Sequence, residues 1–335
     1  MTNEHETFRT VIPLDRFPFS ISHSHSIMCV GSCFAERLSE RMSVRKFRTI
    51  ANPTGILFNP LSIAAGLSRL AGDGSEGEEP LFFHEDRWHS FSFHSRFSHP
   101  DRDVCLRNIM EQMRHGSEFL RHADFLIVTL GTDVAYRLKS DGSVVANCHQ
   151  MPSGMFEKTM LPLDEAFSAL ESALLRIREL RPEAICILTV SPVRYIRNDF
   201  AENSCSKAVL RLVCQRLVNK YTWICYFPAF EIMNDDLRDY RFYAADRIHP
   251  SEEAVDYIWR CFSGIAFSED TCMLNRKIEE IEADFRHRPA FPQSERYRQF
   301  CSSALKRLRQ LKSEHPEIDF SEEEQYFADM SDIRQ

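Results

Sequence analysis

The sequence predicts an α/β protein in which helices cover both faces of a parallel β-sheet, followed by a C-terminal helical extension. Two observations lead to this class. Short apolar runs alternate with amphipathic stretches, which is typical of parallel strands buried beneath helices. From residue 266 onward the apolar runs stop and charge-dense helical sequence takes over. We therefore expect one domain over residues 1–265 and a helical extension over residues 266–335.

The individual elements follow from the apolar runs and the residues that flank them. We predict strands at residues 27–31, 46–50, 124–131, 184–192 and 223–230. We predict helices at residues 33–44, 59–71, 101–118, 164–180, 204–220 and 250–262. Pro60 lies in the first turn of the second helix, where its missing N–H is tolerated. The segment 72–100 is expected to be irregular, and "SDGS" at 140–143 predicts the turn of a loop or hairpin.

Composition excludes several classes of protein. The hydrophobic fraction of 43% and the charged fraction of 27% are ordinary for a globular chain, and the net charge of −8 argues against nucleic-acid or anionic-membrane partners. No apolar run approaches the roughly 18 residues of a membrane span, and the N-terminus lacks the apolar segment of a signal peptide. The eleven cysteines are scattered, as reduced thiols are. We expect a soluble, cytoplasmic protein.

Polar residues follow the carboxyl ends of the predicted strands, which is the edge where ligands bind in parallel sheets. The turns after the first four strands are Gly31-Ser32, Asn52-Pro53-Thr54-Gly55, Gly131-Thr132-Asp133 and Ser191-Pro192-Val193-Arg194. Asp246 and His249 follow the last strand. A serine hydroxyl becomes nucleophilic when an imidazole takes its proton, and a carboxylate must orient that imidazole. The sequence therefore predicts a catalytic set of Ser32, His249 and Asp246.

These residues belong to longer stretches that resemble the GSCFA family, within the SGNH (GDSL-like) hydrolase superfamily. The stretches are "GSCFA" at 31–35, "NPTGILFNPLSIA", "FHSRFSHP", "LIVTLGT", "VVANCH", "LTVSPVR" and "YFPAFEIMNDDLRDYRFYAADRIHP". The resemblance spans residues 25–265. It implies a three-layer α/β/α sandwich with a five-stranded parallel sheet, with Ser32 as the nucleophile and Asp246 and His249 as its partners.

The resemblance also implies an oxyanion hole, with backbone N–H groups of Ser32 and Gly55 as donors. The superfamily carries Gly-x-Asn in its third block, whereas this chain has Asp133 in place of the asparagine. An ionised Asp133 cannot donate a hydrogen bond, and losing one oxyanion donor costs about 10²–10³ in rate. Several residues are candidates to replace the amide, and the sequence does not choose among Thr132, Asn52, Asn59 and Arg194. We expect the substrate to contact Asn52, Asn59, His94, Gly131, Asp133 and Arg194.

Some of these residues also fit other roles. Ser32 taken alone is more typical of a helix N-cap than of a nucleophile. Cys33 is a rival nucleophile, but the next residue in a helix points about 100° away, so we expect a core position. The spacing of five residues between His84, His89, His94 and His99 fits neither a helix face nor a strand face, and it lacks zinc-ligand spacing. We therefore predict no metal, and expect His94 to line the cleft.

The C-terminal extension is basic over residues 286–312 and acidic over residues 313–335. This pattern is typical of a partner-binding arm or of a solvated helix whose basic face pairs with the acidic end, and the second fits the negative net charge better. Leu305, Leu308 and Leu311 suggest docking on the body or on another subunit. Docking on another subunit would make the protein a homo-oligomer through the extension.

The function predicted from these observations is a serine esterase or acyl hydrolase that works through an acyl-enzyme intermediate and needs no cofactor. The expected substrate is an ester of a small alcohol or a saccharide. The alternative is a non-catalytic module that binds a saccharide or an acyl ligand on the same fold, and Asp133 in place of asparagine motivates it. A weaker alternative is a structural protein that acts through residues 266–335.

Overall fold

The computed structural model describes residues 10–72, 79–196 and 199–332. Residues 1–9 lie outside this part, as do residues 73–78 of the segment expected to be irregular. The described residues form two compact units. The larger is built mainly from residues 26–39 and 49–262. The smaller combines residues 16–25 and 40–48 with the chain from residue 263, so the predicted domain boundary at 265/266 stays a prediction.

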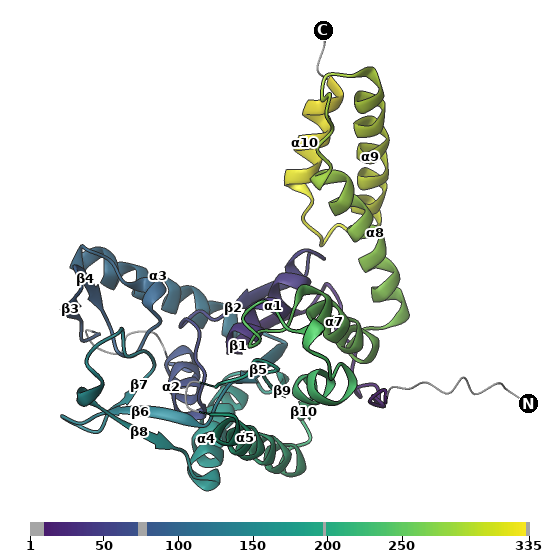
Figure 1. Ribbon diagram of the computed structural model, residues 1–335. Helices are drawn as coiled ribbons and strands as arrows, with labels where there is room; N and C mark the ends of the chain where they lie inside the picture. Colours follow the sequence, from purple (N-terminus) through teal and green to yellow (C-terminus); the bar gives the residue numbers. More distant parts are fainter. Residues whose placement is uncertain (1–9, 73–78, 197–198, 333–335) are drawn as a thin grey trace, which may run out of the picture. The chain divides into compact units, whose positions relative to one another are not determined.

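The larger unit is organised around a five-stranded parallel sheet with the order β10-β9-β5-β1-β2 (Figure 1). Its strands are β1 (Ser26–Gly31), β2 (Arg48–Ala51), β5 (Phe125–Leu130), β9 (Ile185–Val190) and β10 (Ile224–Tyr226). Every residue of β1 and β5 is buried, as expected for central strands covered on both faces. The predicted fold class is confirmed.

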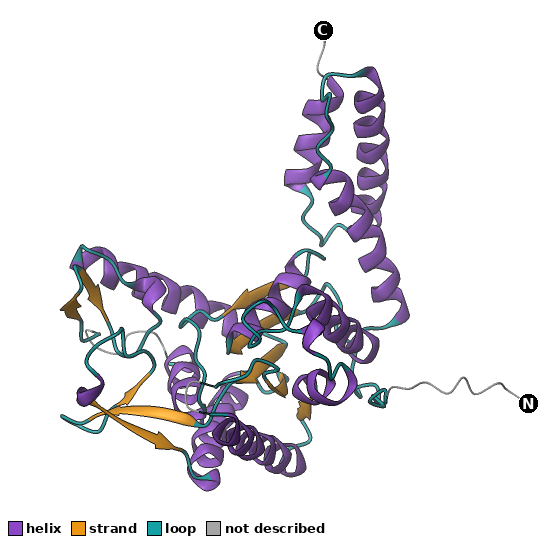
Figure 2. Cartoon of the chain, viewed as in Figure 1, coloured by secondary structure: helices purple, strands orange, loops and turns teal. Residues whose placement is uncertain are grey.

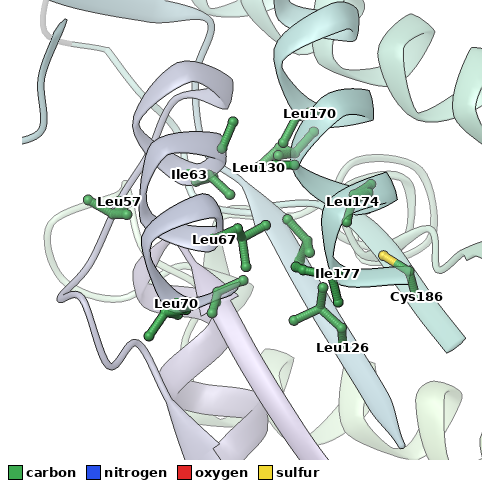
Figure 3. Close-up of a cluster of buried hydrophobic side chains, with 14 of the residues drawn as sticks. Leu57, Ile63, Leu67, Leu70, Leu126, Leu130, Leu170, Leu174, Ile177 and Cys186 are labelled. Atoms are coloured by element: carbon green, nitrogen blue, oxygen red, sulfur yellow. The ribbon is translucent and has the colours of Figure 1, made fainter. Parts of the chain in front are cut away.

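Helices cover both faces of this sheet (Figure 1). One side carries α2 (Pro60–Ala71), α3 (Arg102–Arg121), α4 (Leu163–Leu180) and α5 (Phe200–Lys220), and the other carries α1 (Cys33–Ser43) and α7 (Glu252–Ala266). Figure 3 shows Leu67 of α2 and Leu174 of α4 packed over Leu126 of β5. The apolar faces of these helices recur every three to four residues, so each helix buries one stripe against the strands.

Two small sheets lie outside the main one (Figure 2). β3 (Phe82–His84) and β4 (Arg87–His89) form a hairpin within the segment expected to be irregular, so that expectation was wrong there. β6 (Val134–Leu138) pairs with β7 (Val144–Val145), which confirms the predicted hairpin, and also with β8 (Phe156–Met160). β8 was not predicted because most of its side chains are exposed and polar. Short helical turns occur at η1 (Ser95–Phe97) and η2 (Ser153–Met155).

The chain between β10 and α7 is a succession of short turns. It contains α6 (Ala229–Glu231), a π-helical turn η3 (Ile232–Asp236) and a 3₁₀ turn η4 (Tyr240–Phe242). Residues 243–251 then lead into α7. The loop that carries Asp246 and His249 therefore connects the 3₁₀ turn η4 to the helix α7.

The smaller unit contains the C-terminal helices α8 (Glu269–Arg286), α9 (Glu295–Glu314) and α10 (Ser321–Asp332). Leu305, Leu308 and Leu311 belong to the hydrophobic core of these helices, and docking of the extension on another subunit stays a prediction. Arg309 and Lys312 pair with Glu324 at 3.0 and 2.7 Å, which confirms the predicted pairing of the basic helix with the acidic end.

None of the helices in the described part of the chain combines the length and the apolar character that crossing a membrane requires.

Candidate functional site

Ser32 sits in the tight turn between β1 and α1. Gly31 before it has φ +120°, and a Cβ at that position would lie 2.1 Å from the carbonyl oxygen of Thr129, so only glycine fits. The hydroxyl of Ser32 lies 2.9 Å from the hydroxyl of Thr129 and accepts a hydrogen bond from the N–H of Phe34 at 3.3 Å. Ser32 is 1% exposed. In this conformation Ser32 caps α1 and is tied to β5.

The turn after β2 wraps around Gly31. Asn52 Oδ1 accepts a hydrogen bond of 2.8 Å from the N–H of Gly31, and the N–H of Leu57 donates to the carbonyl of Gly31 at 2.9 Å. Asn52 is fully buried with φ +46°, in the left-handed region that asparagine tolerates. Its Nδ2 atom is buried and has no hydrogen-bond partner within the described residues.

His94 lies against this turn, and its predicted role in lining a cleft stays a prediction. A Cβ on Gly55 would lie 2.2 Å from the Cβ of His94, so the two backbones are in close contact. His94 Nδ1 accepts a hydrogen bond of 3.3 Å from the N–H of Arg96. Arg96 in turn pairs with Glu36 of α1 at 3.0 Å and donates to the carbonyl of Asn52. Burial and the Arg96 charge lower the pKa of His94, which favours its neutral form.

The third strand end is held to the second by backbone hydrogen bonds. The N–H groups of Gly131 and Thr132 both donate to the carbonyl of Phe58, at 2.8 and 3.0 Å. The Thr132 hydroxyl is 3.1 Å from the hydroxyl of Ser206 in α5. Asp133 is 1% exposed, and burial raises the pKa of its carboxyl group. Its N–H donates to Ser206 at 2.8 Å, so α5 anchors this turn.

A lysine that the sequence analysis missed joins the third and fourth strand ends. Lys207 of α5 is fully buried, and its ammonium group donates to the carbonyls of Gly131 and Ser191 at 2.7 and 2.8 Å. Burial lowers the pKa of Lys207 to about 7. A signal existed: Lys207 shares the apolar face of its helix with Leu210 and Cys214, where a charge is unusual.

Asp246 and His249 form a pair within one loop. His249 Nδ1 lies 2.7 Å from Asp246 Oδ2, and Asp246 Oδ1 accepts the N–H groups of Ile248 and His249 at 2.9 and 3.0 Å. The hydrogen bond from His249, with those from the backbone, holds the pKa of Asp246 at about 2. A carboxylate at Nδ1 favours the tautomer with its proton there, which leaves Nε2 as an acceptor.

Arg194 holds this loop at the end of β9. Its N–H donates to the carbonyl of Ile248 at 3.2 Å, and its guanidinium donates to the carbonyl of Arg247 at 3.3 Å. The guanidinium also stacks 3.9 Å from the ring centre of Tyr243 and 5.3 Å from that of Tyr240. Arg194 therefore contacts the loop that carries His249, and its donors are directed at backbone and rings.

The two parts of the predicted catalytic set lie at the same edge of the sheet but are not joined. Arg37 of α1 pairs with Glu252, three residues after His249, so the start of α7 lies beside the helix that follows Ser32. Within the described residues, however, Ser32 makes no hydrogen bond to His249, because its hydroxyl contacts Thr129.

The backbone groups predicted to hold an oxyanion are already bonded within the protein. The N–H of Ser32 donates to the carbonyl and hydroxyl oxygens of Thr129, at 3.0 and 2.8 Å. The N–H of Gly55 donates to the carbonyl of Asn52 at 2.8 Å. Asn59, another candidate, caps α2: its Oδ1 and Nδ2 bond the N–H and hydroxyl of Ser62.

The remaining candidates have local roles. Cys33 is half-buried, and burial raises the pKa of its thiol, which disfavours a thiolate nucleophile. His89 bonds the hydroxyl of Ser98 at 2.6 Å and the carbonyl of His84 at 3.0 Å, so it ties the hairpin of β3 and β4 to the segment after it. His99 Nδ1 accepts the N–H of Asp101 at the start of α3.

Comparison with known proteins bears on this arrangement. The model of the GSCFA family matches residues 26–262, and that of the GSCFA domain protein, C-terminal domain, matches residues 278–331. No curated protein matches the chain. The first match covers more than half of the sequence and includes both the Ser32 turn and the loop of Asp246 and His249. The chain therefore belongs to the GSCFA family.

Proposed function

We propose that this protein is a serine hydrolase of the SGNH (GDSL-like) superfamily that cleaves an ester of a small alcohol or a saccharide. The observation that carries the proposal is the pair of Asp246 and His249, joined at 2.7 Å at the sheet edge where Ser32 follows β1. The carboxylate orients the imidazole and stabilises the imidazolium that a general base becomes. Nε2 is the atom left to accept the proton of Ser32.

The reaction follows from these roles. Ser32 Oγ bonds to the carbonyl carbon of the ester, the C=O π electrons move to the carbonyl oxygen, and the hydroxyl proton passes to His249 Nε2. The intermediate collapses, the bond to the leaving alkoxide oxygen breaks, and His249 returns the proton to that oxygen. Water then repeats the sequence on the acyl-enzyme, which releases the acid and restores Ser32.

This mechanism requires Ser32 to change its hydrogen-bond partner. The hydroxyl must turn from Thr129 toward His249, which exchanges one hydrogen bond for another. Catalytic hydrogen bonds are often long or misaligned without substrate and tighten when it binds. The substrate must also reach Ser32, which is 1% exposed, so binding must open the turn around it.

A second candidate is a non-catalytic module that binds a saccharide or acyl ligand. It is favoured by the buried Ser32 hydroxyl, which bonds Thr129 and caps α1 instead of contacting His249. This candidate predicts ligand binding with no product. For either function we propose a cytoplasmic protein without a nucleic-acid or membrane partner, and a homo-oligomer through the C-terminal helices stays a prediction.

An alkyl fluorophosphonate separates the two candidates, because it reacts with activated serines. We expect the wild type and Cys33→Ala to gain one adduct, located on Ser32 by peptide mass spectrometry, and Ser32→Ala to gain none. Failure of the wild-type protein to react at Ser32, or equal labelling of Ser32→Ala at another residue, would count against the hydrolase. A screen of acylated saccharides by calorimetry would then test the binding module.

A further inference from the structure

We propose that the side-chain amide of Asn52 donates the hydrogen bond to the oxyanion that the absent third-block asparagine would otherwise provide. The inference rests on the proposed hydrolase function, because it assigns a residue to that reaction. In the superfamily the amide donor follows the strand that corresponds to β5, whereas in this chain we assign the donor to the turn after β2. Three observations support it.

The orientation of the amide is determined by its neighbour. The N–H of Gly31 can only donate, so the side-chain atom 2.8 Å from it must be the oxygen Oδ1 of Asn52. Nδ2, on the same carbon, therefore also lies beside Gly31, the residue directly before the nucleophile. The amide donor is thus adjacent to the turn where the acyl carbon would bind.

The second observation is that Nδ2 is an unused donor in a place where donors are normally satisfied. Asn52 is 0% exposed, and Nδ2 has no partner within the described residues. Buried polar groups without partners destabilise the folded state and are few in natural proteins. The left-handed backbone of Asn52, at φ +46°, adds to the constraint at this position. An oxyanion that forms during the reaction would satisfy the donor.

The third observation is that the side chains of the three other candidates already have hydrogen-bond partners within the protein. The hydroxyl of Thr132 lies 3.1 Å from that of Ser206 and accepts the N–H of Val134 at 3.1 Å. Both polar side-chain atoms of Asn59 form hydrogen bonds with Ser62. Arg194 is stacked on Tyr243 and bonded to the loop of His249. Of the four candidates from the sequence, Asn52 is the one with a buried donor that the described protein leaves unbonded.

During the reaction Nδ2–H would point at the carbonyl oxygen as it gains negative charge, after Ser32 Oγ has bonded to the carbon. A donor of this kind acts on the transition state more than on the bound substrate. Its loss should therefore lower kcat and leave KM almost unchanged. Because Ser32 and Asn52 are both buried, the movement that admits substrate to Ser32 must also uncover Asn52.

The test uses the full chain and the rate at which an alkyl fluorophosphonate labels Ser32, since phosphonylation also places negative charge on an oxygen. Asn52→Asp keeps the acceptor for Gly31 and the tolerance of positive φ but removes the donor at pH 8. Asn52→Gly removes the side chain and also tolerates positive φ. The matched controls are Asn147→Asp and Asn147→Gly, since Asn147 Oδ1 likewise accepts a backbone N–H, from His149 at 2.8 Å.

We expect both Asn52 variants to label about 10²–10³ times more slowly than the wild type, and both Asn147 variants to stay within about threefold. Thermal unfolding checks that each variant is folded. Wild-type rates in a folded Asn52 variant would overturn the role of Asn52 and leave the hydrolase standing. If the wild type does not label at Ser32, the hydrolase fails and the role of Asn52 fails with it.

Discussion

The hydroxyl of Ser32 lies 2.9 Å from the hydroxyl of Thr129, and both side chains are buried at the carboxyl end of the sheet. Thr129 also accepts the N–H of Ser32 at 2.8 Å. The residue proposed as nucleophile is therefore held by its neighbouring strand, and the conformation described is one in which the hydroxyl is restrained.

Replacing Thr129 with valine should release that restraint. The shape of the side chain is kept, but the buried Ser32 hydroxyl keeps only the N–H of Phe34 as a partner, so we expect the free energy of unfolding to fall by about 1–3 kcal/mol. Labelling of Ser32 by fluorophosphonate should be unchanged or faster, since the hydroxyl is free to turn toward His249. Urea denaturation and labelling rates measure the two effects.

Thr189→Val is the matched control for this change. Thr189 is the register partner of Thr129 on β9 and is equally buried, and its hydroxyl makes one long bond of 3.5 Å to Val190. It should change neither quantity by much. Slower labelling in Thr129→Val than in Thr189→Val would mean that Thr129 holds Ser32 ready for reaction, contrary to the mechanism proposed.

Asp246→Asn tests the pair directly. The variant retains an oxygen for the backbone N–H groups but presents an NH₂ group to His249, which favours the wrong tautomer of the imidazole. We expect labelling of Ser32 to slow by about 10³–10⁴, with little effect on stability because the loop is exposed. Asp239→Asn is the control, since Asp239 Oδ1 accepts the N–H of Arg241 in a similar turn. Equal rates in the two variants would remove Asp246 from the mechanism.

Arg194→Lys tests whether the guanidinium positions the loop of His249. Lysine keeps the charge but cannot stack as a plane on Tyr243 or reach the Arg247 carbonyl in the same geometry. We expect labelling about tenfold slower and faster hydrogen exchange at residues 244–250. Arg241→Lys, which removes a guanidinium 4.7 Å from the ring of Phe242, should leave both unchanged. Unchanged exchange in Arg194→Lys would show that the loop holds its position without this contact.

His149 makes stability depend on pH. Burial lowers the pKa of His149 from 6.5 to about 4, so the unfolded chain binds more protons than the folded protein between these values. Stability should therefore fall as the pH drops from about 6.5 to about 4, by up to about 3 kcal/mol from this residue. Asn tolerates the left-handed backbone of His149, at φ +48°, so His149→Asn is a suitable variant.

Urea denaturation at pH 7 and pH 5 measures this contribution. The drop in stability should be smaller in His149→Asn than in the wild type. Burial also lowers the pKa of His94 and of His23, so part of the drop should persist in the variant. His115→Asn, on the exposed side of α3, should keep the full drop. An identical drop in His149→Asn and the wild type would contradict the assignment.

The sequence by itself determined the features that depend on local pattern. Continuous apolar runs identified β1, β5, β9 and β10, since strands buried on both faces need apolar side chains at nearly every position. β2 lies at the edge of the sheet and is only partly buried, so its sequence carries no such run. The contact between Asp246 and His249 was also predicted from the sequence, because side chains three residues apart in a turn can form a hydrogen bond without contributions from the rest of the chain. The sequence did not predict strand β8 or the hairpin of β3 and β4, because these strands are short and apolar and polar residues do not alternate along them.

Only the tertiary structure decided which distant residues share the site. Ser32 forms a hydrogen bond with Thr129, 97 residues away in the sequence, and Asn52 forms one with Gly31, 21 residues away. Lys207 forms one with Gly131, 76 residues away. The first two contacts follow from strand order and register, because β1 lies between β2 and β5 and brings their carboxyl ends together. The third follows from the packing of α5, which carries Lys207, against the end of β5. Whether an amide donor is satisfied also depends on all of its neighbours at once. A sequence can name Asn52 as a candidate, but only the packing of the described residues shows that its Nδ2 has no partner among them.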